Sequence, residues 1–509
     1  MTLLARATRG YFWSQFGRLG EVVLFFLLSL VLARKMGPAA YGIFALALSL
    51  VMFCSFLAAM GIAQDTLGKF VPEAAAGRYP GGVGRLLQHL LGVRVIAVAV
   101  LSSAVLLIGR SVGGVMGVAG FAQYLGLTML VFSLRSISEL FCYVFSGLLE
   151  LRVVAAGRSV VPLVALILVA EAILQGRNVS VGDALGAIAV GQLAGLLILA
   201  AAARKCLPAS QSSTGEQNIH LARILSFGLF VWLSGFFSLI LGDASDIMLI
   251  GWLMKDPSAV GFYSVGSSGA FRGINLLLAW LPLIGMSTGC NAYLEGGKES
   301  LLKTAEAVWK LIAISLVPPM FIVYQFSAEF VTLFYSSGYS ASIPVLRILA
   351  ALMAVSGLLG HGLQAGMLYI LDREKIACAI FAGSAIFNVG LGIILIKNFG
   401  IVGAAWATGL SFVFFSILCR TVGNSFVFVR CPGGFLTRIV SASIVSSLTT
   451  LWLKVRSLSE LAIACTLWVF VFLLFLSLVK PLSSNDSSAL RQVNPALAYV
   501  AERFFARST

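Results

Sequence analysis

Two stretches of this sequence repeat one pattern. Residues 32–49 read LARKMGPAAYGIFALALS, and residues 251–268 read GWLMKDPSAVGFYSVGSS. Aligned at an offset of 219 positions, they share the pairs Pro38/Pro257, Ala40/Ala259 and Gly42/Gly261. An aromatic residue follows each glycine, one place out of step. One such echo is ordinary helix punctuation, because Pro starts helices and Gly relaxes turns. Further echoes in the same order would indicate an internal duplication.

The composition indicates a membrane protein. The chain has 509 residues, of which 59% are hydrophobic and only 11% are charged, with a mean hydropathy of +0.99. A soluble protein of this length has roughly a quarter of its residues charged. There is too little polar surface for a water-facing globule, so lipid must be the outer solvent.

Charge and cysteine usage exclude several other classes. The net charge of +15 does not predict nucleic-acid binding, because the basic residues stand singly between apolar runs. The eight cysteines are scattered, without C-x-x-C or metal spacing to histidine, and are interpreted as small buried hydrophobes. We expect no metal and no cofactor. The N-terminus shows no A-x-A-like cleavage site, so its first apolar run is expected to be retained as a span.

Apolar runs of about 20 residues, the length needed to cross a bilayer, occur fourteen times. They lie at 14–33, 41–63, 86–108, 120–148, 156–175, 182–203, 222–254, 258–287, 304–326, 342–370, 376–396, 401–424, 436–454 and 459–479. With the N-terminus inside, 21 of the 35 basic residues fall in cytoplasmic connections, Arg152 and Arg158 among them, and 8 fall outside. Lys and Arg are retained on the cytoplasmic side, so both termini are predicted there.

Further echoes at or near the same offset predict two parallel six-helix repeats. They pair 146–150 with 365–369, 81–82 with 296–297, and 94–98 with 310–314. The predicted organisation is an N-lobe at 1–205 (spans 1–6), a cytoplasmic linker at 206–219, a C-lobe at 220–424 (spans 7–12), two accessory spans within 425–480, and a cytoplasmic tail at 481–509. Duplicated membrane halves are typical of alternating-access transporters, whose site lies between the halves near the midplane.

The residues resemble a known family. The phrases ARKMGPAAYGIFALALSL (33–50), FVPEAAAG (70–77) and DIMLIGWLMKDPSAVGFYSV (246–265) are similar to those of the polysaccharide-export flippases of the multidrug/oligosaccharidyl-lipid/polysaccharide exporter superfamily. The resemblance implies an all-α integral membrane protein of the bacterial inner membrane, with two lobes around a central cavity and two additional C-terminal helices. It also implies transfer of an undecaprenyl-diphosphate-linked oligosaccharide from the inner to the outer leaflet. A glycan polymerase and a chain-length regulator are the expected protein partners, besides membrane lipids.

A charged diphosphate head needs a polar, preferably cationic, path across hydrocarbon. The basic residues within spans are Arg18, Arg94, Arg135, Arg272, Lys310 and Arg347. All but Arg347, which is expected to reach the interface, are candidates for binding the diphosphate or sugar. Arg272 is the strongest candidate, because it lies mid-span with no acid within two turns. Three others have an acid at helical spacing (Arg18 with Glu21, Arg135 with Glu139, Lys310 with Glu306), so structural ion pairs are an equal alternative.

Intramembrane carboxylates commonly mark ion or proton pathways. Asp246, Glu21 and Glu139 are therefore candidates for ion or proton coupling. Asp246 has a structural alternative, as a helix cap or as a partner of Arg272.

No nucleophile–base arrangement and no nucleotide-binding loop occur, so we expect a transporter rather than an enzyme. The leading hypothesis is the flippase. A multidrug or cation antiporter of the same superfamily is the alternative, and its site should be dominated by carboxylates. A membrane glycan polymerase or ligase is less favoured, because it should carry a long external loop with catalytic residues. A structural subunit of an export complex stays open.

Overall fold

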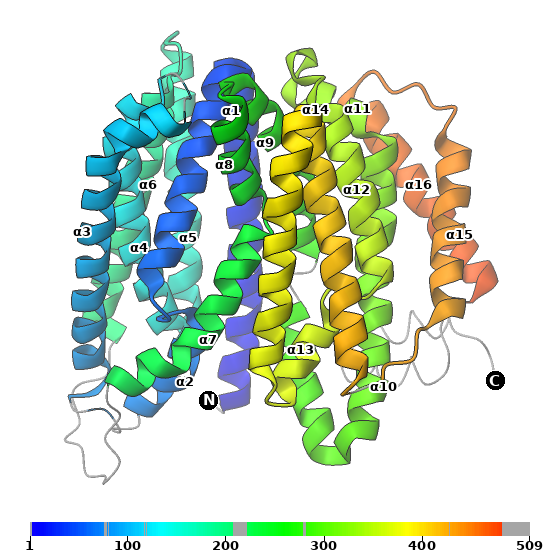
Figure 1. The fold of residues 1–509 in the computed structure, drawn as a ribbon, viewed down its shortest axis with the longest axis horizontal. Coiled ribbons are helices and arrows are strands. Elements are labelled where there is room, and N and C mark those ends of the chain that lie inside the picture. Colours follow the sequence, from blue (N-terminus) through cyan, green and yellow to red (C-terminus); the bar gives the residue numbers. More distant parts are fainter. Residues whose placement is uncertain are drawn as a thin grey trace. The chain divides into compact units, whose positions relative to one another are not determined.

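The computed structural model describes residues 3–75, 79, 81–116, 118, 120–206, 221–277, 281–426 and 428–480, with some side chains inside these ranges left undescribed. The described residues form α-helices, with short 3-10 and π segments and no strand (Figure 1). The all-α class predicted from the composition is confirmed. Because lipid offers backbone groups no hydrogen-bond partners, a chain of this hydropathy must satisfy them within helices.

The described residues include eight helices that are long and apolar enough to cross a membrane, or ten if each of two bent pairs forms one span. Two of the eight are longer than one crossing. The helix at Leu19–Ala59 has a non-helical backbone at Gly37, and the helix at Glu374–Asn424 has one at Gly400. The protein is therefore a multi-pass membrane protein, and the number of fourteen spans stays a prediction.

Contacts between residues divide the chain into two compact units, Met1–Ser264 and Val265–Thr509. The repeats predicted at 1–205 and 220–424 come from sequence echoes rather than from contacts, and these boundaries stay predictions. In the first unit, the start of the second predicted repeat packs with the first repeat.

The first unit is built from α1 to α8 and the start of α9. Their bounds are α1 (Leu3–Ala59), α2 (Gln64–Ala75), α3 (Gly82–Met116), η1 (Ala122–Tyr124), α4 (Leu125–Gly147), α5 (Leu151–Leu174), α6 (Val181–Cys206), α7 (Leu221–Ile240), α8 (Asp243–Met254) and α9 (Pro257–Leu277). The core on one side of this unit gathers Leu67, Phe70 and Val71 of α2 with Phe145 of α4. These α2 residues recur at helical spacing, so one face of this short helix is buried while Lys69 is exposed.

A bend interrupts the long apolar run predicted as one span at 222–254. The helical parts Trp232–Ile240 and Asp243–Met254 meet at an angle of 52°. Asp243 and Asp246 lie in the first turn of α8, where carboxylates complement the positive end of the helix dipole. Hydropathy alone does not reveal this break, because both sides of it are apolar.

The second unit holds the rest of α9 and the later helices. These are α10 (Leu281–Gln325), α11 (Ser327–Glu329), η2 (Phe330–Tyr335), η3 (Ser337–Tyr339), α12 (Ser342–Leu358), α13 (Leu363–Ile370), α14 (Glu374–Asn424), α15 (Gly433–Thr450) and α16 (Leu458–Val479). Within it, α15 and α16 pack against α10 around the buried side chains of Trp468, Phe472 and Ile439. These two C-terminal helices are therefore part of a shared core.

Candidate functional site

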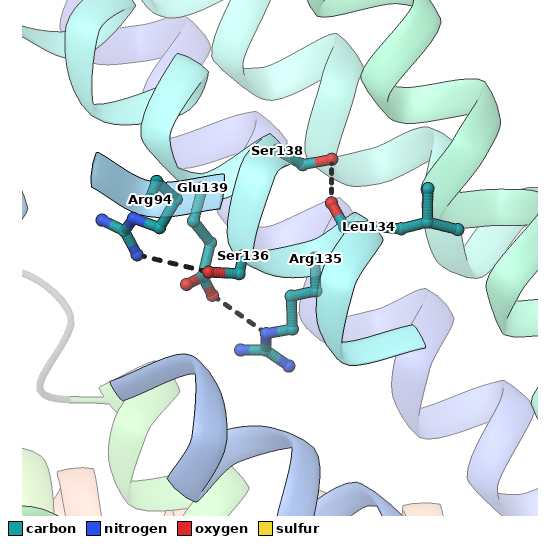
Figure 2. Close-up of polar contacts among 6 residues, drawn as sticks. All are labelled: Arg94, Leu134, Arg135, Ser136, Ser138 and Glu139. Carbon is teal, nitrogen blue, oxygen red and sulfur yellow. Dashed lines mark hydrogen bonds and ion pairs between the residues drawn. The ribbon is translucent and has the colours of Figure 1, made fainter. Parts of the chain in front are cut away.

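Helix α4 presents a polar face in the middle of the first unit. Arg135, Ser138, Glu139 and Cys142 are spaced three and four residues apart, so they lie on one side of the helix. The Arg135 Nε donates to Glu139 Oε1 at 2.9 Å (Figure 2). The two side chains are 34% and 23% exposed, so this pair is open to a cavity while lying within a candidate span.

This face lines a cavity of about 210 Å³. Its walls come from α1, α4, α5 and α6, and the lining residues are Glu21, Phe25, Arg135, Ser138, Glu139, Cys142, Gly157, Arg158, Val161, Gln192 and Leu199. The structure thus brings together three of the residues predicted from sequence (Arg135, Glu21 and Glu139).

The charges around the cavity are balanced. Arg158 of α5 faces the same space as Arg135, and Glu21 of α1 interacts electrostatically with both arginines. Two cations and two carboxylates therefore face one small space in the hydrocarbon region. Such a group is stable only while each charge keeps a partner. A bound anion or a bound cation would have to exchange with one of the internal partners.

Arg94 is fully buried rather than open to this cavity. Its Nη2 donates to the carbonyl oxygen of Ile62 at 2.9 Å, and its Nη1 contacts Ser136 Oγ at 3.4 Å. Figure 2 shows Arg94 hydrogen-bonded to Ser136 and Arg135 hydrogen-bonded to Glu139, and both acceptors are on α4. In this conformation Arg94 ties α3 and α4 to the connection between α1 and α2.

The other predicted site residues lie elsewhere or outside the described side chains. Asp246 is 1% exposed and accepts a hydrogen bond from the Tyr263 hydroxyl at 2.6 Å. Lys310 Nζ lies 3.0 Å from Glu306 Oε1, as the spacing predicted. Arg18 and Arg272 stand on α1 and α9, but their side chains are outside the described residues.

The second unit holds a polar cluster of one histidine and two serines. At a 45° bend between α12 and α13, Gly360, His361 and Gly362 all have positive φ. The His361 Nδ1 and Ser356 Oγ are 2.8 Å apart, and Ser356 Oγ is 2.8 Å from Ser416 Oγ. The two serine hydroxyls and the histidine ring are therefore hydrogen-bonded to one another.

Two polar lining residues on α5 and α6, Arg158 and Gln192, are not among the predicted site residues. Arg158 is the third residue of the predicted span at 156–175 and was counted with the cytoplasmic connection before it. Because α5 begins at Leu151, Arg158 lies two turns inside the helix. Gln192 lies within the predicted span at 182–203. It is the one amide in a long apolar run, 8% exposed, and that isolation was the available signal.

Comparison with known proteins identifies the family of this chain. The model of a family described as polysaccharide biosynthesis protein matches residues 7–270, more than half of the chain. The chain belongs to this family. All of the cavity-lining residues fall inside the matched range. The suspected resemblance is thereby confirmed.

Individual relatives cover most of the chain. A probable low-salt glycan biosynthesis flippase, Agl15 of Haloferax volcanii, is 25% identical over 482 residues, which are 91% of this chain and 94% of the relative. The solved structure of the lipid II flippase MurJ in an inward closed conformation aligns with a TM-score of 0.69 at 12% identity, covering 91% of this chain and 98% of MurJ. An inward-facing multidrug resistance MATE family transporter of the MOP superfamily aligns with a TM-score of 0.67 at 15% identity, covering 79% and 94%.

These comparisons show the class of the protein. It has the fold shared by MurJ and MATE transporters, and its relatives are flippases and transporters rather than enzymes, as the sequence predicted. The structural likenesses are too distant in sequence to transfer a substrate.

Proposed function

We propose that this protein is a flippase. It moves an undecaprenyl-diphosphate-linked oligosaccharide, a repeat unit of a surface polysaccharide, from the inner to the outer leaflet by alternating access. The observation that carries the proposal is the polysaccharide biosynthesis family match, which spans every residue of the charged cavity. The flippase relative of nearly equal length supports the same direction.

The cavity offers chemistry suited to an anionic head. Arg135 and Arg158 are the accessible guanidinium groups, and a planar guanidinium can hold two phosphate oxygens at once. Arg18, Arg272 and Lys310 are proposed as further contacts along the route. Arg94 is the weakest of the proposed contacts, because its buried guanidinium already holds Ile62.

Arg135 could couple substrate binding to uptake of a proton or a cation, because its guanidinium is the partner of both the diphosphate and Glu139. A diphosphate bound to Arg135 would compete with Glu139 for the same guanidinium. A carboxylate left without a cation in a low-dielectric site is costly, so Glu139 would then take up a proton or a cation. Glu21 shares this cavity and is proposed to act with Glu139. Asp246, held by Tyr263, is proposed as a separate coupling residue.

The surroundings of the proposed activity follow from the same assignment. The protein is proposed to lie in a bacterial inner membrane with both termini in the cytoplasm. The glycan it delivers would be consumed outside by a glycan polymerase with its chain-length regulator. No nucleic acid takes part.

The test is a deletion strain complemented with the wild-type chain, Arg135→Gln, or Arg135→Lys. Lipid-linked glycan is measured by mass spectrometry of lipid extracts, and its leaflet by binding of an impermeant lectin to spheroplasts and to inverted vesicles. The deletion and Arg135→Gln should accumulate glycan on the inner leaflet. Arg135→Lys should restore part of the transfer, because it keeps the charge but loses the two-pronged geometry.

The same strains decide the alternatives. Normal glycan in the deletion together with changed drug resistance would overturn the flippase in favour of a multidrug or cation antiporter, which the carboxylates of the cavity and the MATE-like fold would then explain. Accumulation of unpolymerised glycan on the outer leaflet would instead indicate a polymerase or ligase.

A further inference from the structure

The two similar stretches at 32–49 and 251–268 contact each other at their shared proline and glycine positions. A Cβ on Gly42 would overlap the carbonyl oxygen of Pro257 and come within 2.8 Å of the Gly261 nitrogen. A Cβ on Gly261 would overlap the carbonyl oxygen of Pro38 and come within 3.2 Å of the Gly42 nitrogen. The contact is reciprocal: each copy offers its glycine to the proline carbonyl of the other, as in a two-fold interface. Only glycine permits backbones to approach this closely.

A second close contact lies at the other end of the same helical segment. We call residues 38–59, the part of α1 after its break at Gly37, the 38–59 segment. Just beyond its end, a Cβ on Gly228 of α7 would overlap the carbonyl oxygen of Gly61, and a Cβ on Gly61 would lie 3.0 Å from the Gly228 carbonyl carbon.

Aromatic side chains reinforce this second contact. The Phe56 ring stacks on Trp232 with centroids 6.3 Å apart and packs against Phe236 at the same separation. The Trp232 indole N–H donates to the Phe56 carbonyl oxygen at 2.9 Å. Phe56 is in the last turn of its helix, where carbonyl groups lack partners within the helix, so the indole satisfies one of them.

The first repeat holds the same end independently. The Ile62 carbonyl oxygen accepts from the Arg94 guanidinium, which α3 supplies. The last turn of the 38–59 segment is thus held to the second repeat by Trp232 at Phe56. The chain just after the segment is held to its own repeat by Arg94 at Ile62. If α7 moved away, the bond to Trp232 would break and the bond to Arg94 would remain.

The two contacts face opposite sides in the orientation predicted from the basic residues. Three of the eight basic residues predicted outside, Arg34, Lys35 and Lys255, flank the Gly42–Gly261 contact. Lys69, one of the 21 predicted in cytoplasmic connections, follows the Gly61–Gly228 contact. A route that passes between the two repeats must part at one of these contacts to admit its cargo and at the other to release it.

We infer that the 38–59 segment and Gly61 just after it close the translocation route at both ends, outside through the Gly42–Gly261 contact and inside through the Gly61–Gly228 contact. Trp232 is the positioning residue of the inner closure. This inference rests on the proposed alternating access and assigns residues to it. The two closures differ in kind. The outer one is backbone against backbone, and the inner one adds a hydrogen bond and ring stacking.

The experiment is hydrogen–deuterium exchange by mass spectrometry on the full chain in lipid nanodiscs, without substrate. It compares wild type with Gly42→Ala and Gly228→Ala, each of which places a methyl group in one contact. Gly42→Ala should speed exchange about tenfold in peptides covering 38–46 and 257–264, and not in those covering 56–63 and 228–236. Gly228→Ala should instead speed exchange in the peptides covering 56–63 and 228–236, and not in those covering 38–46 and 257–264. Gly92→Ala is the control, because a Cβ there has no neighbour within 4 Å.

Trp232→Phe tests the inner closure more gently. It keeps an aromatic ring against Phe56 and removes the N–H donor, so exchange should rise about threefold in the inner peptides alone. Trp252→Phe is the matched control, since Trp252 is 43% exposed.

Two results would overturn the inference: the same exchange pattern from both alanine variants, or no inner response to Trp232→Phe. If the alanine variants unfold throughout, the Trp232→Phe comparison decides. Opposite responses in a protein that does not transfer lipid-linked glycan would keep the closures and overturn the proposed substrate. If the protein transfers lipid-linked glycan but the two alanine variants do not respond in different peptides, the flippase stands and the two closures are overturned.

Discussion

The fourth predicted span of each repeat has taken a different form. In the first copy, α4 runs unbroken and carries the Arg135–Glu139 pair on its cavity face. At the 219-residue offset these positions are Ala354 and Leu358 in the second copy, on a helix that breaks at 360–362. The charge-bearing copy is continuous, and the bent copy is uncharged at the matching positions. At these matching positions, only the first of the two predicted repeats carries an ion pair.

The largest expected effect comes from forcing the second copy to resemble the first. Ala354 is 6% exposed, so Ala354→Arg would force a long cation into a closely packed part of the helix. We expect a loss of more than about 4 kcal/mol in the free energy of unfolding, seen as little folded protein in nanodiscs. Wild-type stability would mean that the second unit contains polar space like that of the first.

The next effect comes from removing the charge that distinguishes the first copy. Arg135→Ala leaves Glu139 without its bonded cation and should lower the unfolding free energy by about 3 kcal/mol. The double variant Arg135→Ala/Glu139→Gln should recover part of this loss. Lys303→Ala is the control: its partner Glu299 and Lys303 itself are 81% and 77% exposed, so that pair should contribute little. Equal effects of the two single variants in thermal unfolding would contradict the comparison.

A smaller effect concerns the backbone. Gly362 has φ of 78°, and a Cβ there would lie 2.9 Å from the Phe415 ring, so Gly362→Ala should destabilise by about 2 kcal/mol. Gly126 lies in α4 with no neighbour within 4 Å of an added Cβ. Gly126→Ala should be neutral or stabilising by up to about 1 kcal/mol, because alanine favours a helix. Chemical unfolding in nanodiscs separates the two, and a tolerated Gly362→Ala would show that the bend does not require glycine.

The smallest effect concerns the polar cluster of Ser356, His361 and Ser416 at the bend between α12 and α13. Ser356→Ala removes the hydroxyl between His361 and Ser416 and should cost about 1 kcal/mol. Ser443 in α15 donates to the carbonyl oxygen of Ile439 on its own helix, a local bond, so Ser443→Ala should cost less. A reversed order in thermal unfolding would mean that the cluster in the second copy does not stabilise the bend.

The sequence predicted what depends on local spacing. Helical structure followed from hydropathy, and the Arg135–Glu139 and Lys310–Glu306 pairs followed from the i,i+4 rule, since both partners stand on one helix. It did not predict the partners that other helices supply. Arg158 and Gln192 join the cavity only because α5 and α6 pack beside α4, and Asp246 is bonded by Tyr263 of the next helix.

Backbone geometry inside apolar runs was also beyond prediction. The run at 222–254 is apolar on both sides of its bend, so hydropathy is the same for a straight and a bent helix. The bend at 360–362 carried a stronger signal in its two glycines, which flank a histidine with φ of 34°. Glycine-rich punctuation therefore indicates where a span can break, and packing decides whether it does.

The reciprocal contact between Gly42 and Gly261 has a consequence for how the chain can change. Two segments of one chain can change independently in sequence where each contacts only its own surroundings. Here a methyl group added at either glycine meets the backbone of the other segment, so each segment requires glycine in the other. The contact alone is enough to keep the two phrases alike at these positions.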